Sequence, residues 1–223
     1  MFEQITVLVP TRGRVKRLRK MMESFRETSA GYAKLFFRVD DDDAETQKQL
    51  VGQSYIVGPR LNGYASLPWF FNQLAAASEG VLMLGNDDIV FKTPEWDLRI
   101  LQEANKYPDG VFNFGVTTHN EQNFPLTIVS KKAVDVVGAL FPDGIFWGDI
   151  FWRDVAAAFG RAIRLPSVEI DHEWAGFSPD QTFMAGDTVR RSDHMHHHQA
   201  AVDAAVEKLS ANPAVRALRE AKV

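Results

Sequence analysis

The sequence predicts an α/β fold built on a mostly parallel central sheet with helices on its faces. Along the first half of the chain, short apolar runs alternate with amphipathic segments of helical spacing, which is typical of successive βαβ units. Three of the apolar runs are followed directly by polar clusters, as expected where parallel strands end at one edge of a sheet. A chain of 223 residues is long enough for one sizeable domain.

The first half reads as a Rossmann-like succession of strands and helices. The strand at 4–10 is rich in β-branched residues and stops at Pro10. Apolar side chains then recur at helical spacing from Val15 to Phe25. Composition predicts, in chain order, a strand at 33–40, a helix at 44–50, a strand at 55–58, a helix at 67–78 and a buried strand at 80–85.

The second half is less regular. The pattern predicts helices at 94–107 and 147–160, the latter capped by Gly160, and strands at 110–116, 125–130 and 162–174. From about Gln199 the tail is alanine-rich and is predicted to be helical, with a break at Pro213. We expect one continuous domain followed by a C-terminal helical extension.

Composition excludes several classes of protein. The chain has no cysteine, so it has neither disulfides nor thiolate metal sites, and any metal must bind oxygen or imidazole. Its net charge of -4 argues against nonspecific nucleic-acid binding, although six basic residues lie between Arg12 and Lys20. The simplest interpretation of that segment is a solvated helix face. The N-terminus reads as a strand, and no apolar run approaches the ~20 residues of a membrane span, so we expect a cytoplasmic protein with no membrane partner.

Polar residues after three strands carry the chemistry. The clusters are PTRGR at 10–14, DDDD at 40–43 and GNDD at 85–88. A site lined by carboxylates and arginines suits a nucleotide with a divalent cation. Within DDDD, we expect the first two acids to point into this site and Asp42 and Asp43 to cap the following helix.

In this order the segments resemble the nucleotide-sugar-binding half of GT-A fold glycosyltransferases. Residues 86–88 stand where that family carries its Asp-x-Asp motif, with Asn86 in place of the first acid. The resemblance implies that Asp88 binds Mn²⁺ or Mg²⁺. It also implies a nucleotide-sugar-binding set, which comprises Pro10, Thr11, Arg12, Arg14, Asp40, Asp41, Asp42, Arg60, Asn86 and Asp87.

The segment FWGDIFWRD at 146–154 resembles the acceptor side of inverting members, which present a catalytic base at a helix start. That position is Asp149 here, and the glutamate that often precedes the base is Gly148. The alternative is that Asp149 only interacts with the helix dipole. Trp147 is expected to be exposed and, with Gly148, to contact the acceptor, while Trp152 is expected in the core.

The segment VEIDHEWAGFSPDQTF at 168–183 is similar to the ending of glycosyltransferase-like proteins often encoded by phages, and implies that His172 completes the metal site. The resemblance divides the chain into a GT-A-like domain at 1–185, with a nucleotide-sugar-binding half at 1–92 and an acceptor half at 93–185, and an extension at 186–223. The location would then be the host cytoplasm.

The resemblance implies a metal-dependent, inverting glycosyltransferase whose donor is a nucleoside diphosphate sugar, with a UDP-sugar favoured. Its acceptor would be a hydroxymethylated pyrimidine in phage DNA or, alternatively, a glycan or small molecule. Two rival functions stay open: a nucleotidyltransferase and a nucleotide-sugar binding module without catalysis. Outside the site, aromatic residues 69–71 are expected in the core. A surface or tail role is expected for His194, His196, His197 and His198.

Overall fold

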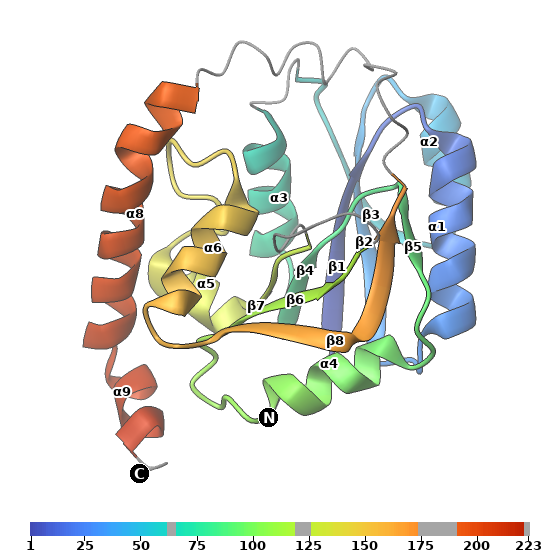
Figure 1. Cartoon of the computed structure of the whole chain (residues 1–223). Helices are drawn as coiled ribbons and strands as arrows, with labels where there is room; N and C mark the ends of the chain where they lie inside the picture. The colour runs from blue at the N-terminus through green and yellow to red at the C-terminus, as the bar shows by residue number, and fades with distance from the viewer. Residues whose placement is uncertain (62–65, 119–125, 174–190, 221–223) are drawn as a thin grey trace.

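The computed structural model describes residues 1–61, 66–118, 126–173 and 191–220, with side chains omitted at 191–196. The strands of the described part are β1 (Ile5–Thr11), β2 (Ala33–Asp40), β3 (Ser54–Gly58), β4 (Val81–Leu84), β5 (Ile89–Phe91), β6 (Asn113–Thr117), β7 (Ile128–Ser130) and β8 (Ala162–His172). They form one curved sheet in the order β3-β2-β1-β4-β7-β6-β8-β5 (Figure 1).

Helices cover both faces of this sheet (Figure 1). They are α1 (Val15–Thr28), α2 (Ala44–Gln49), α3 (Leu67–Ala76), α4 (Trp96–Ala104), α5 (Lys131–Val137), α6 (Gly148–Ala157), α8 (Arg191–Ala211) and α9 (Pro213–Glu220). In the picture α1 and α2 flank one side of the sheet, α3, α5 and α6 flank the other, and α8 lies outermost.

The predicted α/β fold with a mostly parallel sheet is confirmed. β1 pairs in parallel with β2 and β4, and β2 pairs in parallel with β3. The carboxyl ends of β1, β2, β3 and β4 therefore lie at one edge of the sheet. Farther along, β7 is antiparallel to β4, and β5 is antiparallel to β8.

β1 is buried along its whole length and, apart from Thr6 and Thr11, apolar, because both of its faces are covered. Val7 and Val9 pack in one hydrophobic cluster with Leu18 of α1. Leu8 points the other way, into a second cluster that includes Phe71 of α3. The two clusters fix the register of the central strand, and with it the position of the residues that follow each strand.

Two elements were not predicted. β5 is only three residues long, and from the sequence its apolar residues could not be told from a continuation of the preceding apolar segment. α5 has clear end signals, because Ser130 Oγ accepts the N–H of Ala133 at 2.9 Å and Gly138 ends the helix at φ 107°. These signals lie directly after a strand, and the serine was read only as the end of that strand.

The C-terminal helices pack on the domain. α8 packs against α5 and α6, and it begins at Arg191 rather than near Gln199. The predicted break at Pro213 is confirmed, because this proline starts α9. No helix within 1–61, 66–118, 126–173 and 191–220 is long and apolar enough to cross a membrane.

His198 is buried on α8, so the expected surface role is wrong for this residue. It shares a helix face with Val202, Ala205 and Leu209, and its Nε2 lies 2.9 Å from Asp154 Oδ2 of α6. His197 is exposed as expected. The side chains of two further histidines, His194 and His196, lie outside the described part.

Asp97 ties the connection between α1 and β2 to α4. Its buried carboxylate accepts Ser29 Oγ–H at 2.6 Å and the backbone N–H groups of Ala30 and Tyr32, both at 2.8 Å. We expect Asp97→Ala to lower the free energy of unfolding by about 3 kcal/mol, because three donors lose their acceptor. Urea denaturation measures this loss, and Asp97→Asn, which keeps one acceptor oxygen, should lose less. A cost near zero for Asp97→Ala would show that water replaces the carboxylate.

Candidate functional site

The edge where β1, β2 and β4 end brings together the three polar clusters singled out in the sequence. Thr11, the last residue of β1, donates its hydroxyl to Asp87 Oδ2 at 2.7 Å. Arg12 contacts Asp40 at the end of β2, with Nη1 2.8 Å from Oδ2. Residues about 30 and 76 positions apart in the sequence are therefore hydrogen-bonded neighbours at this edge.

Asp87 is fully buried and anchors Arg14. Arg14 Nε donates to Asp87 Oδ2 at 3.1 Å, and Arg14 Nη2 lies 2.6 Å from Oδ1, which makes a side-on pair through two nitrogens. Burial raises the pKa of Asp87 to about 6, although Arg14 and Thr11 act in the opposite direction. This pair holds the Arg14 guanidinium beside Asp88.

Asp88 lies beside His172, and these are the two residues that the GT-A resemblance assigned to one metal site. β5 pairs antiparallel with β8 so that Ile89 is opposite His172, and His172 Nε2 lies 3.2 Å from Asp88 Oδ1. Burial acts to raise the pKa of Asp88, but His172 and the nearby arginines hold it below its usual range. Asp88 directly precedes β5 and His172 ends β8, so the pairing of these two strands brings the two side chains together.

These two side chains fit a divalent cation. A carboxylate oxygen and an imidazole nitrogen are ligands that Mn²⁺ accepts, and Mg²⁺ is usually held by one or two carboxylates together with substrate phosphates and water. Over the described ranges, no group of three His, Asp or Glu side chains could hold a metal. Asp88 and His172 would therefore be joined on the cation by other oxygen ligands, such as water or the phosphates of a substrate.

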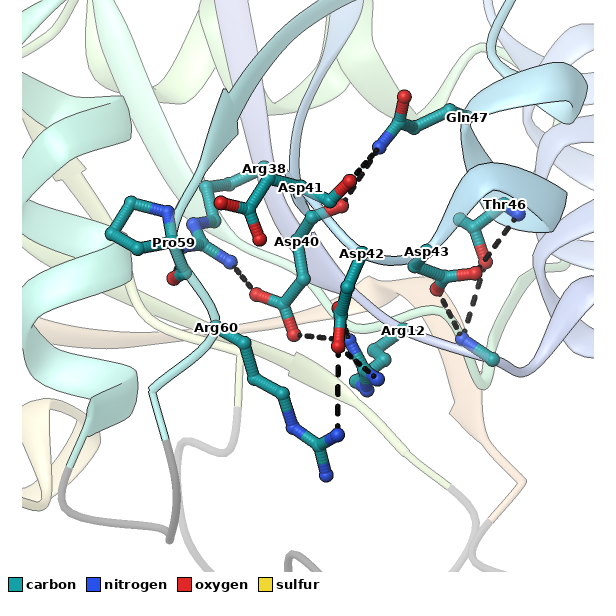
Figure 2. Close-up of polar contacts among 11 residues, drawn as sticks. Arg12, Arg38, Asp40, Asp41, Asp42, Asp43, Thr46, Gln47, Pro59 and Arg60 are labelled. Carbon is teal, nitrogen blue, oxygen red and sulfur yellow. Dashed lines mark hydrogen bonds and ion pairs between the residues drawn. The ribbon is translucent and has the colours of Figure 1, made fainter.

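Of the four consecutive aspartates, Asp40 and Asp42 are paired with arginines (Figure 2). Asp40 is buried, with one oxygen toward Arg12 and the other hydrogen-bonded by Arg38. Asp42 pairs with Arg12, whose Nη2 donates to Oδ2 at 3.1 Å, and with Arg60 at 3.5 Å. The repulsion between neighbouring carboxylates is thus offset by cations between them.

The other two acids have different roles. Asp43 is the N-cap of α2, where it accepts the N–H of Thr46 at 3.1 Å, and it also accepts the N–H of Gly13 at 2.8 Å. The predicted cap is confirmed for Asp43 and wrong for Asp42, which turns to Arg12 instead. Asp41 is exposed, and its carboxylate has no hydrogen bond or ion pair within the described residues. Of the two leading acids predicted to point into the site, Asp40 has both oxygens engaged by arginines, whereas the carboxylate of Asp41 is exposed.

The cap at Asp43 makes a pH-dependent contribution to stability. Burial acts to raise its pKa, but hydrogen bonds from Thr46 and Gly13 hold the pKa below its usual range. The carboxylate therefore stabilises the fold above its unfolded pKa of about 4, and this contribution is lost as the pH falls through the folded pKa. We expect Asp43→Ala to cost about 1 kcal/mol at pH 7.

Urea denaturation at pH 7 and near pH 3 tests this expectation, since the difference from the wild type should shrink at the lower pH. Asp43→Asn is the matched control, because it keeps a capping oxygen without an ionisable group. An equal cost for the alanine variant at both pH values would contradict the assignment.

The start of α6 carries the residues predicted for the acceptor. Asp149 lies half-buried in the first turn of the helix, after Trp147 at the N-cap. In Figure 1 this end of α6 lies at the same end of the molecule as the carboxyl ends of β1 and β2. A Cβ at Gly148 would lie 2.5 Å from the ring of Phe141, which explains why no glutamate stands at this position.

The aromatic predictions are confirmed in part. Trp152 is in the core, where its Nε1–H donates to the carbonyl of Leu140 at 2.7 Å. Trp147 is half-buried rather than fully exposed. Phe70 is buried, but the expectation for Trp69 is wrong, because it is 40% exposed. Trp69 follows Pro68 in the first turn of α3 and turns partly outward.

Sequence reasoning missed two arginines. Arg17 lies three residues after Arg14, on the same side of the start of α1, and its Nη1 is 3.7 Å from Asp88 Oδ2. Arg38 is 1% exposed and stacks on the ring of Phe70 at 3.8 Å. It stands two residues before Asp40 in an apolar strand, so the period of two that places both on one face was a usable signal.

No protein-family model and no curated protein sequence matches the chain. Solved structures do share its fold. Mannosyltransferase PcManGT from Pyrobaculum calidifontis in complex with GDP-Man and Mn²⁺ superposes with a TM-score of 0.64 at 15% identity, over 99% of this chain and 75% of that chain. S. aureus TarS 1-349 in complex with UDP gives 0.60 at 11% identity, over 94% of this chain and 66% of that chain.

A third structure, of a mycobacterial protein, gives a TM-score of 0.54 at 16% identity, over 76% of this chain and 67% of that chain. At such low identities the superpositions show a shared fold. The activity has to be inferred from the residues of the site. The chain therefore has the GT-A-like α/β fold that its sequence predicted, with a curved sheet between helices and further helices at its C-terminus.

Proposed function

We propose that this chain is a metal-dependent glycosyltransferase that uses a nucleoside diphosphate sugar. The observation that carries the proposal is the pair Asp88 and His172, 3.2 Å apart, at the sheet edge where the arginines of PTRGR gather. Two neighbours of the same fold are complexes with GDP-Man and UDP, so UDP- and GDP-sugars are the first donors to test.

In this proposal each residue of the edge has a distinct role. Asp88 and His172 hold Mn²⁺ or Mg²⁺, which neutralises the charge that develops on the leaving diphosphate. Asp87 holds Arg14 toward that diphosphate. Asn86 contacts ribose or sugar through its amide. The nucleoside lies along the residues that end β1 and β2, namely Pro10, Thr11, Arg12, Asp40, Asp41, Asp42 and Arg60.

Asp149 acts as the base that takes the proton of the acceptor hydroxyl, and attack from the opposite side of the sugar would invert the anomeric centre. Trp147 supplies an aromatic face beside it. Gly148 leaves no side chain between the two, since Phe141 fills the space that a Cβ would need. The acceptor is therefore expected at the start of α6.

The salt dependence of transfer distinguishes the possible classes of acceptor. A hydroxymethylated pyrimidine in DNA would be held through phosphates, so transfer to it should fall steeply with salt. The basic segment at 12–20 is only weak support for a DNA acceptor, because its residues Arg14, Arg17 and Lys20 already pair with acids of this chain. A glycan or small-molecule acceptor predicts transfer that depends little on salt.

The proposal is tested by a thermal-shift screen of UDP, GDP and their sugars, each with and without Mn²⁺. A donor at 100 times its Kd should add about 2.7 kcal/mol to the free energy of unfolding. At a fixed donor concentration, the stabilisation should be larger with Mn²⁺ than without it. Release of nucleoside diphosphate on adding acceptor would support the proposal. Release of pyrophosphate would favour a nucleotidyltransferase, and metal-independent binding without turnover would favour a binding module.

A further inference from the structure

Two guanidinium groups stand beside the carboxylate proposed to bind the cation. Arg14 Nη1 lies 3.5 Å and Arg17 Nη1 lies 3.7 Å from Asp88 Oδ2, while His172 faces the other oxygen. The Arg14 contact is a long hydrogen bond, and the Arg17 contact is an ion pair without one; both are longer than the usual charge-assisted hydrogen bond. Asp88 is thus neutralised by charges that lie near it without being tightly bound to it.

The two arginines differ in how they are held. Arg14 is anchored to the buried Asp87 through Nε and Nη2, so only its third nitrogen is directed at Asp88. Arg17 has no such anchor: among the described residues its contact with Asp88 is its only ion pair, and its side chain is 38% exposed. Arg17 can therefore move away from Asp88 without breaking a second ion pair with the described residues.

We propose that Arg17 is an exchangeable counter-ion of the site. Before substrate binds, Arg17 neutralises Asp88. When Asp88 takes up a divalent cation, Arg17 releases the carboxylate and contacts the diphosphate that arrives with the cation. This inference rests on the proposed function, because it assigns a diphosphate-positioning role to a residue of that site.

The charges explain why the exchange depends on the diphosphate. A divalent cation at Asp88 is repelled by the Arg17 guanidinium, so Arg17 weakens the binding of the cation alone. A diphosphate attracts both positive groups and removes this repulsion. Cation and nucleoside diphosphate must then strengthen each other's binding by the same factor.

The exchange predicts effects of opposite sign for one substitution. In Arg17→Gln the affinity for Mn²⁺ alone should rise about fivefold, because a repelling charge is gone. The affinity for UDP or GDP in the presence of Mn²⁺ should fall about tenfold, because a phosphate contact is lost. A residue that only supports the fold would weaken both.

Calorimetric titration measures both affinities, with Mn²⁺ alone and with UDP or GDP at saturating Mn²⁺. Arg19→Gln is the matched control: it removes the same charge from the same helix, but Arg19 is directed at Gln49, with Nε 2.8 Å from Oε1. It should change neither affinity by more than about twofold, since solvent and salt screen its charge. Thermal melting of each variant checks that the fold is intact.

Two results would overturn the exchange: an Arg17→Gln variant in which both affinities fall together, and one in which neither changes. Either result leaves the proposed function standing if the wild type binds Mn²⁺ and a nucleoside diphosphate cooperatively. A wild type that binds no nucleoside diphosphate, with or without Mn²⁺, would reject the proposed function itself and the exchange with it.

Discussion

Replacing Asp88 with asparagine is expected to abolish metal-dependent sugar transfer in a protein that remains folded. Asparagine has the shape of aspartate but lacks the charge that holds a divalent cation between the carboxylate and His172. Losing the charge stabilisation of the leaving group should lower kcat by about 10²- to 10³-fold. Release of nucleoside diphosphate with and without Mn²⁺ measures the effect.

Binding experiments separate this cause from damage to the fold. Asp88→Asn should lose the calorimetric signal for Mn²⁺ while its melting temperature stays near that of the wild type. Asp135→Asn is the control, because this exposed acid of α5 pairs only with Lys131 in the described part of the chain. Full Mn²⁺-dependent turnover by Asp88→Asn would remove the basis of the proposed metal site.

Asp149→Asn is expected to lose sugar transfer and to keep donor binding. Its carboxylate is proposed to take the acceptor proton, and removing a general base commonly lowers the rate by about 10²- to 10⁴-fold. The site for cation and diphosphate is formed by other elements, so the affinities for Mn²⁺ and nucleoside diphosphate should not change. Single-turnover transfer measured alongside calorimetry distinguishes the two effects.

A second acid on the same helix provides the control for Asp149. Asp154 pairs with Arg153 at 2.8 Å and with His198 at 2.9 Å, and these contacts hold its pKa below its usual range against the effect of burial. Asp154→Asn should lose some stability but retain turnover. If Asp149→Asn also kept full turnover, Asp149 would be only an acid that interacts with the α6 dipole.

The sequence was most informative where structure depends on neighbours along the chain. The buried β1 and the amphipathic α1 follow from the spacing of apolar residues. The break at Pro213 is also local, because a proline lacks the backbone N–H that would continue the preceding helix. Such features are determined by a few consecutive residues, so reading them in order was sufficient.

Side-chain partners were less predictable because they lie far apart in the sequence. Asp42 and Asp43 are adjacent acids before the same helix, yet one turns to Arg12 and the other caps α2. Which one does which depends on where β1 places Arg12. His198 was expected on the surface, since nothing in a run of histidines shows that α6 will present Asp154 to one of them.

The α/β fold, the strand ends that carry polar residues, and the acids and histidine proposed for chemistry were all predictable from the order of residues along the chain. Other pairings depend on tertiary packing and appear only in the folded chain: Arg14 is anchored on the buried Asp87, and Arg17 is directed at Asp88. The physical reason is that apolar periodicity is a local property, whereas ion pairs depend on strand order and register across the whole sheet.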